Sequence, residues 1–198
     1  GDDMIVGGAG SDYIDGGAGI DTVSYAASSA WVNVDLANNN HWNGDAAWDN
    51  ISNGENIIGS AYGDALTGTT GVNVLTGGNG NDTLTGLAGN DTLYGGIGDD
   101  SITGGDNNDL IIGGAGSDYI DGGAGTDTVS YTDSAAWVNV NLATNSHWNG
   151  DASWDNIINV ENIIGSAYSD ALTGNALATS LTGGLGNDTL TGLGGNDT

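Results

Sequence analysis

A single aliphatic side chain in every nine residues is the main apolar signal over most of this sequence. Residues 77–103 read GGNGNDTLTGLAGNDTLYGGIGDDSIT, with Leu84, Leu93 and Ile102 at the eighth place of three successive blocks. Thr, Ser or Tyr flanks each of them. In a strand, this alternation sends the aliphatic side chain to one face and its neighbours to the other. The pattern therefore predicts three-residue strands.

The six residues between successive strands have the composition of turns. Glycine recurs there, and it suits positions with positive φ or close backbone approach. The alternation of strand and turn predicts a parallel solenoid with two blocks per coil, in which residues eighteen apart stack about 4.8 Å from each other. This core is too thin to outweigh chain entropy by itself. The residues predicted to fill it, alternately from two facing sheets, are Leu75, Leu84, Leu93, Ile102, Ile111, Ile120 and Val129.

A second period, of 106 residues, organises the blocks. The motif DTVSY at 21–25 returns at 127–131. Two insertions, which we name the linking coils, occupy 25–58 and 131–164. Nine-residue blocks fill the remaining stretches, 1–24, 59–130 and 165–198. We expect one continuous solenoid of tandem units. Because the chain begins and ends inside a block, we also expect it to be a window of a longer chain.

Charge limits the partners that this chain can have. It has 26 acidic residues and neither Lys nor Arg, so its formal net charge is −26. Without basic side chains to contact phosphate, it is not expected to bind nucleic acid or an anionic membrane. No apolar run approaches the roughly 20 residues that cross a bilayer, so membrane insertion is not expected either. There is no Cys, so any cross-link must be a metal ion rather than a disulfide.

Aspartate at the sixth place of the block points to that metal. Thirteen blocks have it. In the predicted solenoid Asp82 lies over Asp100, and Asp91 lies over Asp109, so the carboxylates form rows along both edges. Such rows repel strongly unless cations lie between them, and Ca²⁺ tolerates an irregular cage of carboxylate and carbonyl oxygens better than Mg²⁺ does. The alternative is that each Asp is an ordinary turn residue, which the repetition at one register disfavours.

The blocks GGAGSDYID, GGNGNDTLT and GGIGDDSIT resemble the GGxGxDxUx nonapeptide of RTX (repeats-in-toxin) proteins. The resemblance implies an all-β fold, a right-handed parallel β-roll (β-helix solenoid), with Ca²⁺ in its turns. It also implies type I secretion from bacteria. The implied metal ligands are Asp3, Asp12, Asp21, Asp64, Asp82, Asp91, Asp100, Asp109, Asp118, Asp127, Asp170, Asp188 and Asp197. Where Asn73 and Thr179 replace the Asp, and in the glycine-poor blocks that begin at Gly59 and Gly165, the pattern lapses.

The linking coils carry all the Trp and His of the chain: Trp31, His41, Trp42, Trp48, Trp137, His147, Trp148 and Trp154. Three interpretations are open. The Trp side chains pack the coil onto the roll as a local core, or they contact neighbouring chains or units, or they stack on the sugar rings of an extracellular glycan. A further ion held by Asp49 and Glu55, and by their counterparts Asp155 and Glu161, is a fourth hypothesis.

These features predict a calcium-dependent structural module of a long repetitive secreted surface protein, adhesin or filament. It would fold on binding Ca²⁺ after export, because metal binding and folding are coupled in such sites. The expected location is extracellular, at the cell surface or in the matrix. Two alternatives remain. One is an RTX module of a secreted enzyme whose catalytic domain lies elsewhere, since this stretch has no HExxH or GxSxG motif and is not itself expected to be an enzyme. The other is a carbohydrate-binding repeat.

Overall fold

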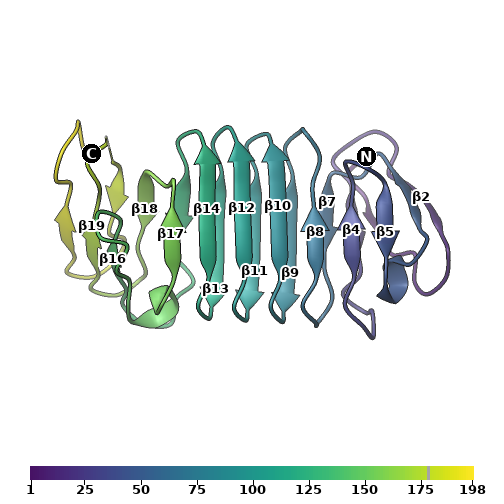
Figure 1. Cartoon of the computed structure of the whole chain (residues 1–198), viewed down its shortest axis with the longest axis horizontal. Helices are drawn as coiled ribbons and strands as arrows, with labels where there is room; N and C mark the ends of the chain where they lie inside the picture. Colours follow the sequence, from purple (N-terminus) through teal and green to yellow (C-terminus); the bar gives the residue numbers. More distant parts are fainter. Residues whose placement is uncertain (178) are drawn as a thin grey trace.

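The computed structural model describes residues 1–177 and 179–198. The chain is an all-β solenoid, a parallel β-roll, whose short strands line up along one axis (Figure 1). The only helices in the described residues are two single 3-10 turns, η1 (Gly44–Ala46) and η2 (Gly150–Ala152). Neither is long or apolar enough to cross a membrane.

One side of the roll is a single nine-stranded sheet. Its strands, in spatial order, are β1 (Met4–Ile5), β3 (Thr22–Ser24), β7 (Asn56–Ile58), β9 (Val74–Asn79), β11 (Thr92–Ile97), β13 (Leu110–Ala115), β15 (Thr128–Ser130), β18 (Asn162–Ile164) and β20 (Leu181–Thr182). All pairings within it are parallel.

The other side is divided into three sheets. The central one contains β17 (Asn156–Ile158), β14 (Tyr119–Ala124), β12 (Ser101–Asp106), β10 (Thr83–Ala88), β8 (Ala65–Thr67), β4 (Asn33–Asp35) and β5 (Asn40–Trp42). The two outer ones pair β2 (Tyr13–Asp15) with β6 (Asn50–Ser52), and β16 (Asn139–Asn141) with β19 (Ala171–Thr173) and then β21 (Thr189–Thr191).

Strand pairing confirms two blocks per coil. Leu84 lies opposite Ile102, and Leu93 lies opposite Ile111, each pair eighteen residues apart. All seven aliphatic residues predicted to form the ladder are fully buried. Burial of such a side chain contributes about 1.5–3 kcal/mol, and the roll is only one such side chain deep per strand. The predicted all-β roll is therefore confirmed, with a core as thin as the sequence indicated.

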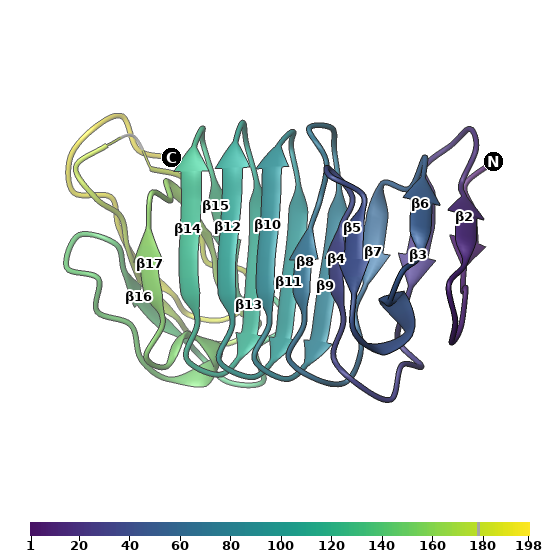
Figure 2. The same cartoon turned by 45° about the vertical axis from the view of Figure 1, so that its right-hand side comes forward.

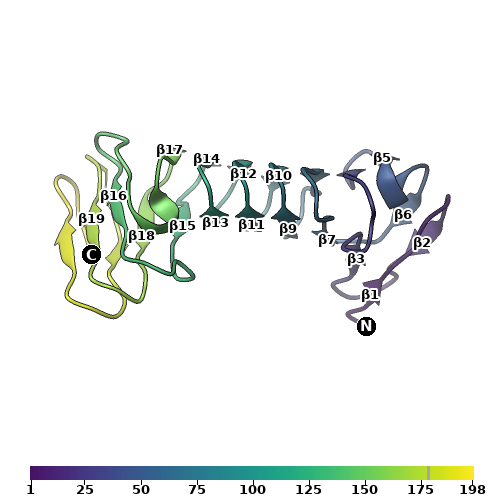
Figure 3. The same ribbon diagram turned by 90° about the horizontal axis from the view of Figure 1, so that it is seen from below.

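Each linking coil interrupts one side of the roll and leaves the other continuous. The first coil supplies β6, which pairs with β2, and β4, which pairs with β8, so the divided side changes sheet there. The second coil does the same with β17 and β16. On the opposite side β3 pairs directly with β7, and β15 with β18. Figure 2 shows β8, β10, β12 and β14 side by side, and Figure 3 shows the roll narrow there and wider at both linking coils.

Glycine allows the coils to stack closely in the turns. Gly96 has a φ of 118°, in the left-handed region, and a Cβ at this position would collide with the carbonyl oxygen of Gly78 in the preceding coil. Only glycine combines this φ with such an approach of two backbones. The turns of successive coils therefore bring backbone oxygens close to one another.

Candidate metal centre

Aspartates at the sixth place of the block stack in two rows, as the sequence predicted. Along one edge the backbone N–H of Asp82 donates to Oδ1 of Asp100 at 2.8 Å, and that of Asp100 donates to Oδ1 of Asp118 at 2.9 Å. Along the other edge Asp91 donates in the same way to Asp109 at 2.8 Å. Each carboxylate therefore has one oxygen fixed by the backbone of the previous coil.

The second oxygen of most of these carboxylates has no such partner. Oδ2 is buried without a hydrogen bond to any described residue in eight aspartates, which we name the open carboxylates: Asp12, Asp21, Asp82, Asp91, Asp100, Asp109, Asp118 and Asp127. An unpaired buried carboxylate oxygen costs far more than a neutral polar group, so native proteins pair such charges or place them on metals. The repetition of the same free atom in eight turns indicates a site for a positively charged ligand.

A backbone carbonyl oxygen borders the space next to the free oxygen in most of the uninterrupted blocks. A Cβ on Gly77 would collide with Oδ2 of Asp82 and would lie 2.7 Å from the carbonyl oxygen of Gly95. A Cβ on Gly86 would likewise collide with Oδ2 of Asp91 and lie 2.6 Å from the carbonyl oxygen of Gly104. Glycine at the first place of the block thus leaves a cradle with a carboxylate oxygen on one side and a carbonyl oxygen on the other.

Burial disfavours the charged form of these carboxylates in the absence of a cation. It raises the pKa of Asp82 and Asp100 to about 7, and that of Asp109 and Asp118 to about 6. Hydrogen bonds from the backbone of the preceding coil oppose this effect, whereas neighbouring carboxylates add to it at all four residues. A bound cation would reverse the balance by favouring the charged form.

These residues fit Ca²⁺. A hard cation that prefers carboxylate and carbonyl oxygens matches a site built only from such atoms. No group of three or more His, Cys, Asp or Glu side chains within 1–177 and 179–198 is placed to hold one ion. The carboxylates instead lie one per turn, so Asp would supply the charge and glycine carbonyls the remaining protein oxygens. When bound, the cation supplies charge compensation and a link between successive coils.

The remaining predicted ligands lie in two other environments. Asp64 and Asp170 are buried, but both oxygens of each accept hydrogen bonds from the chain. Asp3, Asp188 and Asp197 lie in the first and last coils and are exposed or half-buried. At the two lapsed positions, the backbone N–H groups of Asn73 and Thr179 still donate to Asp91 and Asp197. The row thus passes through Asn73 and Thr179 without a carboxylate. The ligand role of the thirteen aspartates stays a prediction.

Two acidic residues of each linking coil continue the rows. The backbone N–H of Asp12 donates to Oδ1 of Asp49 at 2.8 Å, and that of Asp21 donates to Oε2 of Glu55 at 2.8 Å. In the second coil Asp155 and Glu161 accept from Asp118 and Asp127. The spacing in sequence is no longer eighteen, so the nine-residue period could not reveal it, although the repeat of these acids after 106 residues was visible.

The fifth place of the block forms a second ladder, which the sequence reasoning missed. Oδ1 of Asn81 accepts from the N–H of Asp99 at 3.1 Å, and Oδ1 of Asp99 accepts from the N–H of Ser117 at 2.9 Å. In this ladder the side chain accepts a hydrogen bond from the backbone of the following coil, whereas in the Asp rows it accepts one from the preceding coil. The available signal was the recurrence of Asn, Asp, Ser or Thr at this place.

The aromatic residues of the linking coils do not form the local core that was one of three interpretations. Trp48 and Trp154 are 80% and 81% exposed, and the other four Trp side chains are also exposed. Trp31 and Trp42 stack edge to face with centroids 5.0 Å apart, as do Trp137 and Trp148 at 5.2 Å. The coil core instead consists of smaller side chains, among them Val32, Val34 and Ala46 in the first coil.

His41 and His147, named from the sequence as possible contacts with a partner or glycan, are buried; that contact stays a prediction. Nδ1 of His41 accepts the backbone N–H of Asp35 at 3.1 Å, and Nε2 lies 2.9 Å from Oδ1 of Asn39. The ring thus bridges the β4–β5 hairpin to the Asn39 loop. Burial lowers the pKa of His41 and lowers that of His147 to about 4, which keeps both rings neutral.

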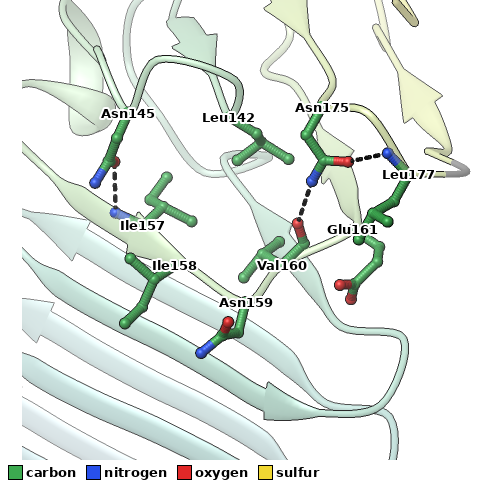
Figure 4. A pocket seen from close by; sticks show the side chains of 9 residues that line it. All are labelled: Leu142, Asn145, Ile157, Ile158, Asn159, Val160, Glu161, Asn175 and Leu177. Carbon is green, nitrogen blue, oxygen red and sulfur yellow. Dashed lines mark hydrogen bonds between the residues drawn. The ribbon is translucent and has the colours of Figure 1, made fainter. Parts of the chain in front are cut away.

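A cavity of about 290 Å³ lies where the second linking coil meets residues 175–177 (Figure 4). Its lining is mostly aliphatic and amide side chains, and Glu161 is the only ionisable residue among the described ones that line it. A single carboxylate does not provide an acid–base pair or a set of metal ligands, so this cavity is not the centre of the chemistry.

Comparison with known proteins agrees with the geometry of the turns. The family model of the RTX calcium-binding nonapeptide repeat (four copies) matches residues 1–23, 58–93, 67–102, 94–129 and 173–198, together more than half of the chain. No curated protein sequence is significantly similar to the chain. Most of each linking coil lies outside the matched residues. The rows of buried aspartates and the matched repeats lead to one conclusion: the chain belongs to the RTX calcium-binding nonapeptide repeat family.

Proposed function

We propose that this chain is a calcium-dependent extracellular structural module, part of a long repetitive secreted surface protein, adhesin or filament. The observation that carries the proposal is the set of eight open carboxylates in a chain without a single Lys or Arg. Nothing in the sequence can neutralise them, so the folded state requires cations from outside.

Folding would follow the calcium concentration. A ligand that binds only the folded state stabilises it progressively as its concentration rises above the dissociation constant. Extracellular calcium modules bind with dissociation constants of about 10⁻⁴ to 10⁻³ M. Where calcium is scarce, repulsion among the carboxylates would keep the chain unfolded and exportable, and outside the cell it would fold into a rod.

The unbroken nine-stranded sheet supports a structural role. It connects β1 to β20 across both linking coils, so successive units share one hydrogen-bonded side. Repeats of this kind contact mainly their neighbours, and a longer array would extend the same axis. The absence of a core thick enough to stand alone makes the ions part of the structure rather than an addition to it.

A calcium titration tests the proposal. Circular dichroism of the chain at pH 7.5 is expected to change from a disordered spectrum in EGTA to a β spectrum at millimolar Ca²⁺, and to return when EGTA is added. Mg²⁺ at the same concentration is expected to be much less effective, because it demands a near-ideal octahedral site. A chain equally folded in EGTA and in Ca²⁺ would contradict the proposal.

A second role, binding of a neutral glycan by the linking coils, is favoured by one observation. Trp48 and Trp154 are exposed at φ values of 73° and 74°, and left-handed backbone costs a non-glycine residue about 1–2 kcal/mol. Strain at an exposed aromatic residue, present in both coils, suggests a contact that needs the ring. A neutral sugar suits the site better than an anionic one, because the chain has no basic residue.

The double variant Trp48→Gly, Trp154→Gly tests this second role, since glycine fits the backbone and removes the ring. It is expected to fold with calcium as the original chain does and to lose at least about ten-fold in glycan affinity on a glycan array. Tyr62→Ala, which removes an exposed aromatic residue outside the linking coils, is the matched control. Absence of any glycan binding by the original chain would exclude the role.

A further inference from the structure

We infer that the turns in and next to each linking coil are closed by hydrogen-bond donors from the protein, so that calcium binds in the uninterrupted nonapeptides and skips these turns. The inference rests on the proposed function, because it assigns calcium to the open carboxylates and denies it to four others. These four, which we name the sealed carboxylates, are Asp49, Asp64, Asp155 and Asp170.

A tyrosine hydroxyl takes the free oxygen of two sealed carboxylates. Asp155 stands in the row after Asp118 and accepts its backbone N–H on Oδ1 at 3.0 Å, as the open carboxylates do. Its Oδ2, however, accepts the hydroxyl of Tyr131 at 2.7 Å, and the Tyr131 ring is buried. The first coil repeats the arrangement, with the Tyr25 hydroxyl 2.8 Å from Oδ2 of Asp49. A donor from the chain thus lies where the other turns have an unpaired oxygen.

A serine seals the other two carboxylates. Oδ2 of Asp64 accepts the backbone N–H of Ser60 at 2.5 Å, and Oδ1 accepts the Ser60 hydroxyl at 2.8 Å and the N–H of Val32 at 2.7 Å. Asp170 has the same three partners one unit later, from Ser166 and Val138. In the uninterrupted blocks over 77–130, the residue after the first glycine is glycine in every block but one, which has the apolar Leu87. No hydroxyl is therefore present at this place.

Amide side chains supply donors at the blocks where the Asp is missing. Nδ2 of Asn73 donates to the carbonyl oxygen of Glu55 at 2.6 Å and to the Thr69 hydroxyl at 3.1 Å. In the second unit Nδ2 of Asn175 donates to the carbonyl oxygen of Val160 at 3.3 Å, as Figure 4 shows. A carbonyl oxygen of the linking coil therefore faces a protein donor instead of an ion.

The open and sealed turns differ by a small number of donors. Asp100 has one oxygen bound by Asp82 and one free, whereas Asp155 has one oxygen bound by Asp118 and one bound by Tyr131. Calcium at a sealed turn would have to displace a buried hydrogen bond and move a packed tyrosine. The six open carboxylates from Asp82 to Asp127 consequently form two uninterrupted rows of three. The row of Asp82, Asp100 and Asp118 lies between the sealed Asp64 and Asp155. The other row lies between Asn73 and Glu161.

The number of calcium ions per chain tests this inference. It is measured by equilibrium dialysis at saturating Ca²⁺, with circular dichroism to establish that each variant is folded. Tyr131→Phe removes only the hydroxyl on Asp155 and is expected to bind one calcium more than the original chain. Asp155→Asn, which removes a sealed carboxylate, is expected to bind the same number as the original chain.

A second route keeps the test decisive if Tyr131→Phe fails to fold. The double variant Thr69→Gly, Asn73→Asp gives this turn the glycine and the carboxylate of the repeat and removes the Thr69 hydroxyl that donates to residue 73. It is also expected to add one calcium ion. The inference is overturned if the folded variant adds none, or if Asp155→Asn loses one. An original chain that binds no calcium at all would instead overturn the proposed function, so the two failures are distinguishable.

Discussion

Acidifying the calcium-free chain from pH 7.5 to about pH 5 is expected to fold it. The pKa of Asp82 and Asp100 is raised to about 7, and that of Asp109 and Asp118 to about 6, from an ordinary value of 3.8. Between pH 4 and 7 the folded state therefore binds more protons than the unfolded state. Stability then falls as the pH rises through this range and increases as the pH falls. Protons would replace calcium as the neutralising ligand.

The buried histidines oppose this effect. Burial lowers the pKa of both rings, so the stability that they contribute is lost as the pH falls from 6.5 toward about 4, the value for His147. The chain has only two such histidines but a larger number of aspartates with raised pKa, among them Asp155 at about 7. The net effect of mild acid on the free energy of folding is therefore stabilising.

Circular dichroism in EGTA over a series of pH values measures the effect. The β signal is expected to appear between pH 7 and 5 in EGTA. Over the same range the calcium concentration at half-folding is expected to fall, because protons already stabilise the folded state. The affinity of the folded chain for calcium, measured by equilibrium dialysis, is expected to fall too, because protons and calcium compete for the same oxygens. A chain that stays unfolded in EGTA at pH 5 would contradict this prediction. It would show that the charge of the buried carboxylates is not what prevents folding without calcium.

Two neighbouring residues provide the sharpest test of the calcium sites. Asp100→Asn is expected to raise the calcium concentration at half-folding by about 10-fold or more, equivalent to about 1.4 kcal/mol, and to lower the number of bound ions. Asp100 is buried with a free Oδ2, and the substitution removes its charge from the middle of a run.

Asp99→Asn removes the same charge one residue away and is the matched control. Asp99 belongs to the ladder at the fifth place, where its Oδ1 accepts the N–H of Ser117, and asparagine keeps this acceptor. Its effect on the calcium midpoint is expected to be small. Equal effects of the two variants would mean that calcium responds to the net charge of the chain rather than to particular carboxylates.

Periodicity explains why the roll could be predicted from sequence and the linking coils could not. The eighteen-residue register places Leu84 against Ile102 and Asp82 against Asp100, and the same pairing recurs in the other coils of the run. The positions of the residues in one block therefore predict those in the others. Inside the linking coil the decisive contacts occur once per 106 residues. The bond between Tyr131 and Asp155 spans 24 residues and follows from the path of the chain through β16 and η2.

The Trp side chains show a second limit of sequence reasoning. Size and hydrophobicity favoured packing, but the interior of the coil is filled by Val32, Val34 and Ala46, and the neutral ring of His41 closes the hairpin. A local pattern gives the composition of an element but does not give the space available inside it.

The continuous sheet has a mechanical consequence. In a parallel roll the backbone hydrogen bonds run along the axis, so tension applied to the two ends loads both sides of the narrow stretch together. At each linking coil one side changes sheet, and only the pairing of β3 with β7, or of β15 with β18, continues across it as an unbroken ladder. A long array would therefore bend and unfold first at the linking coils, which recur once in every 106 residues.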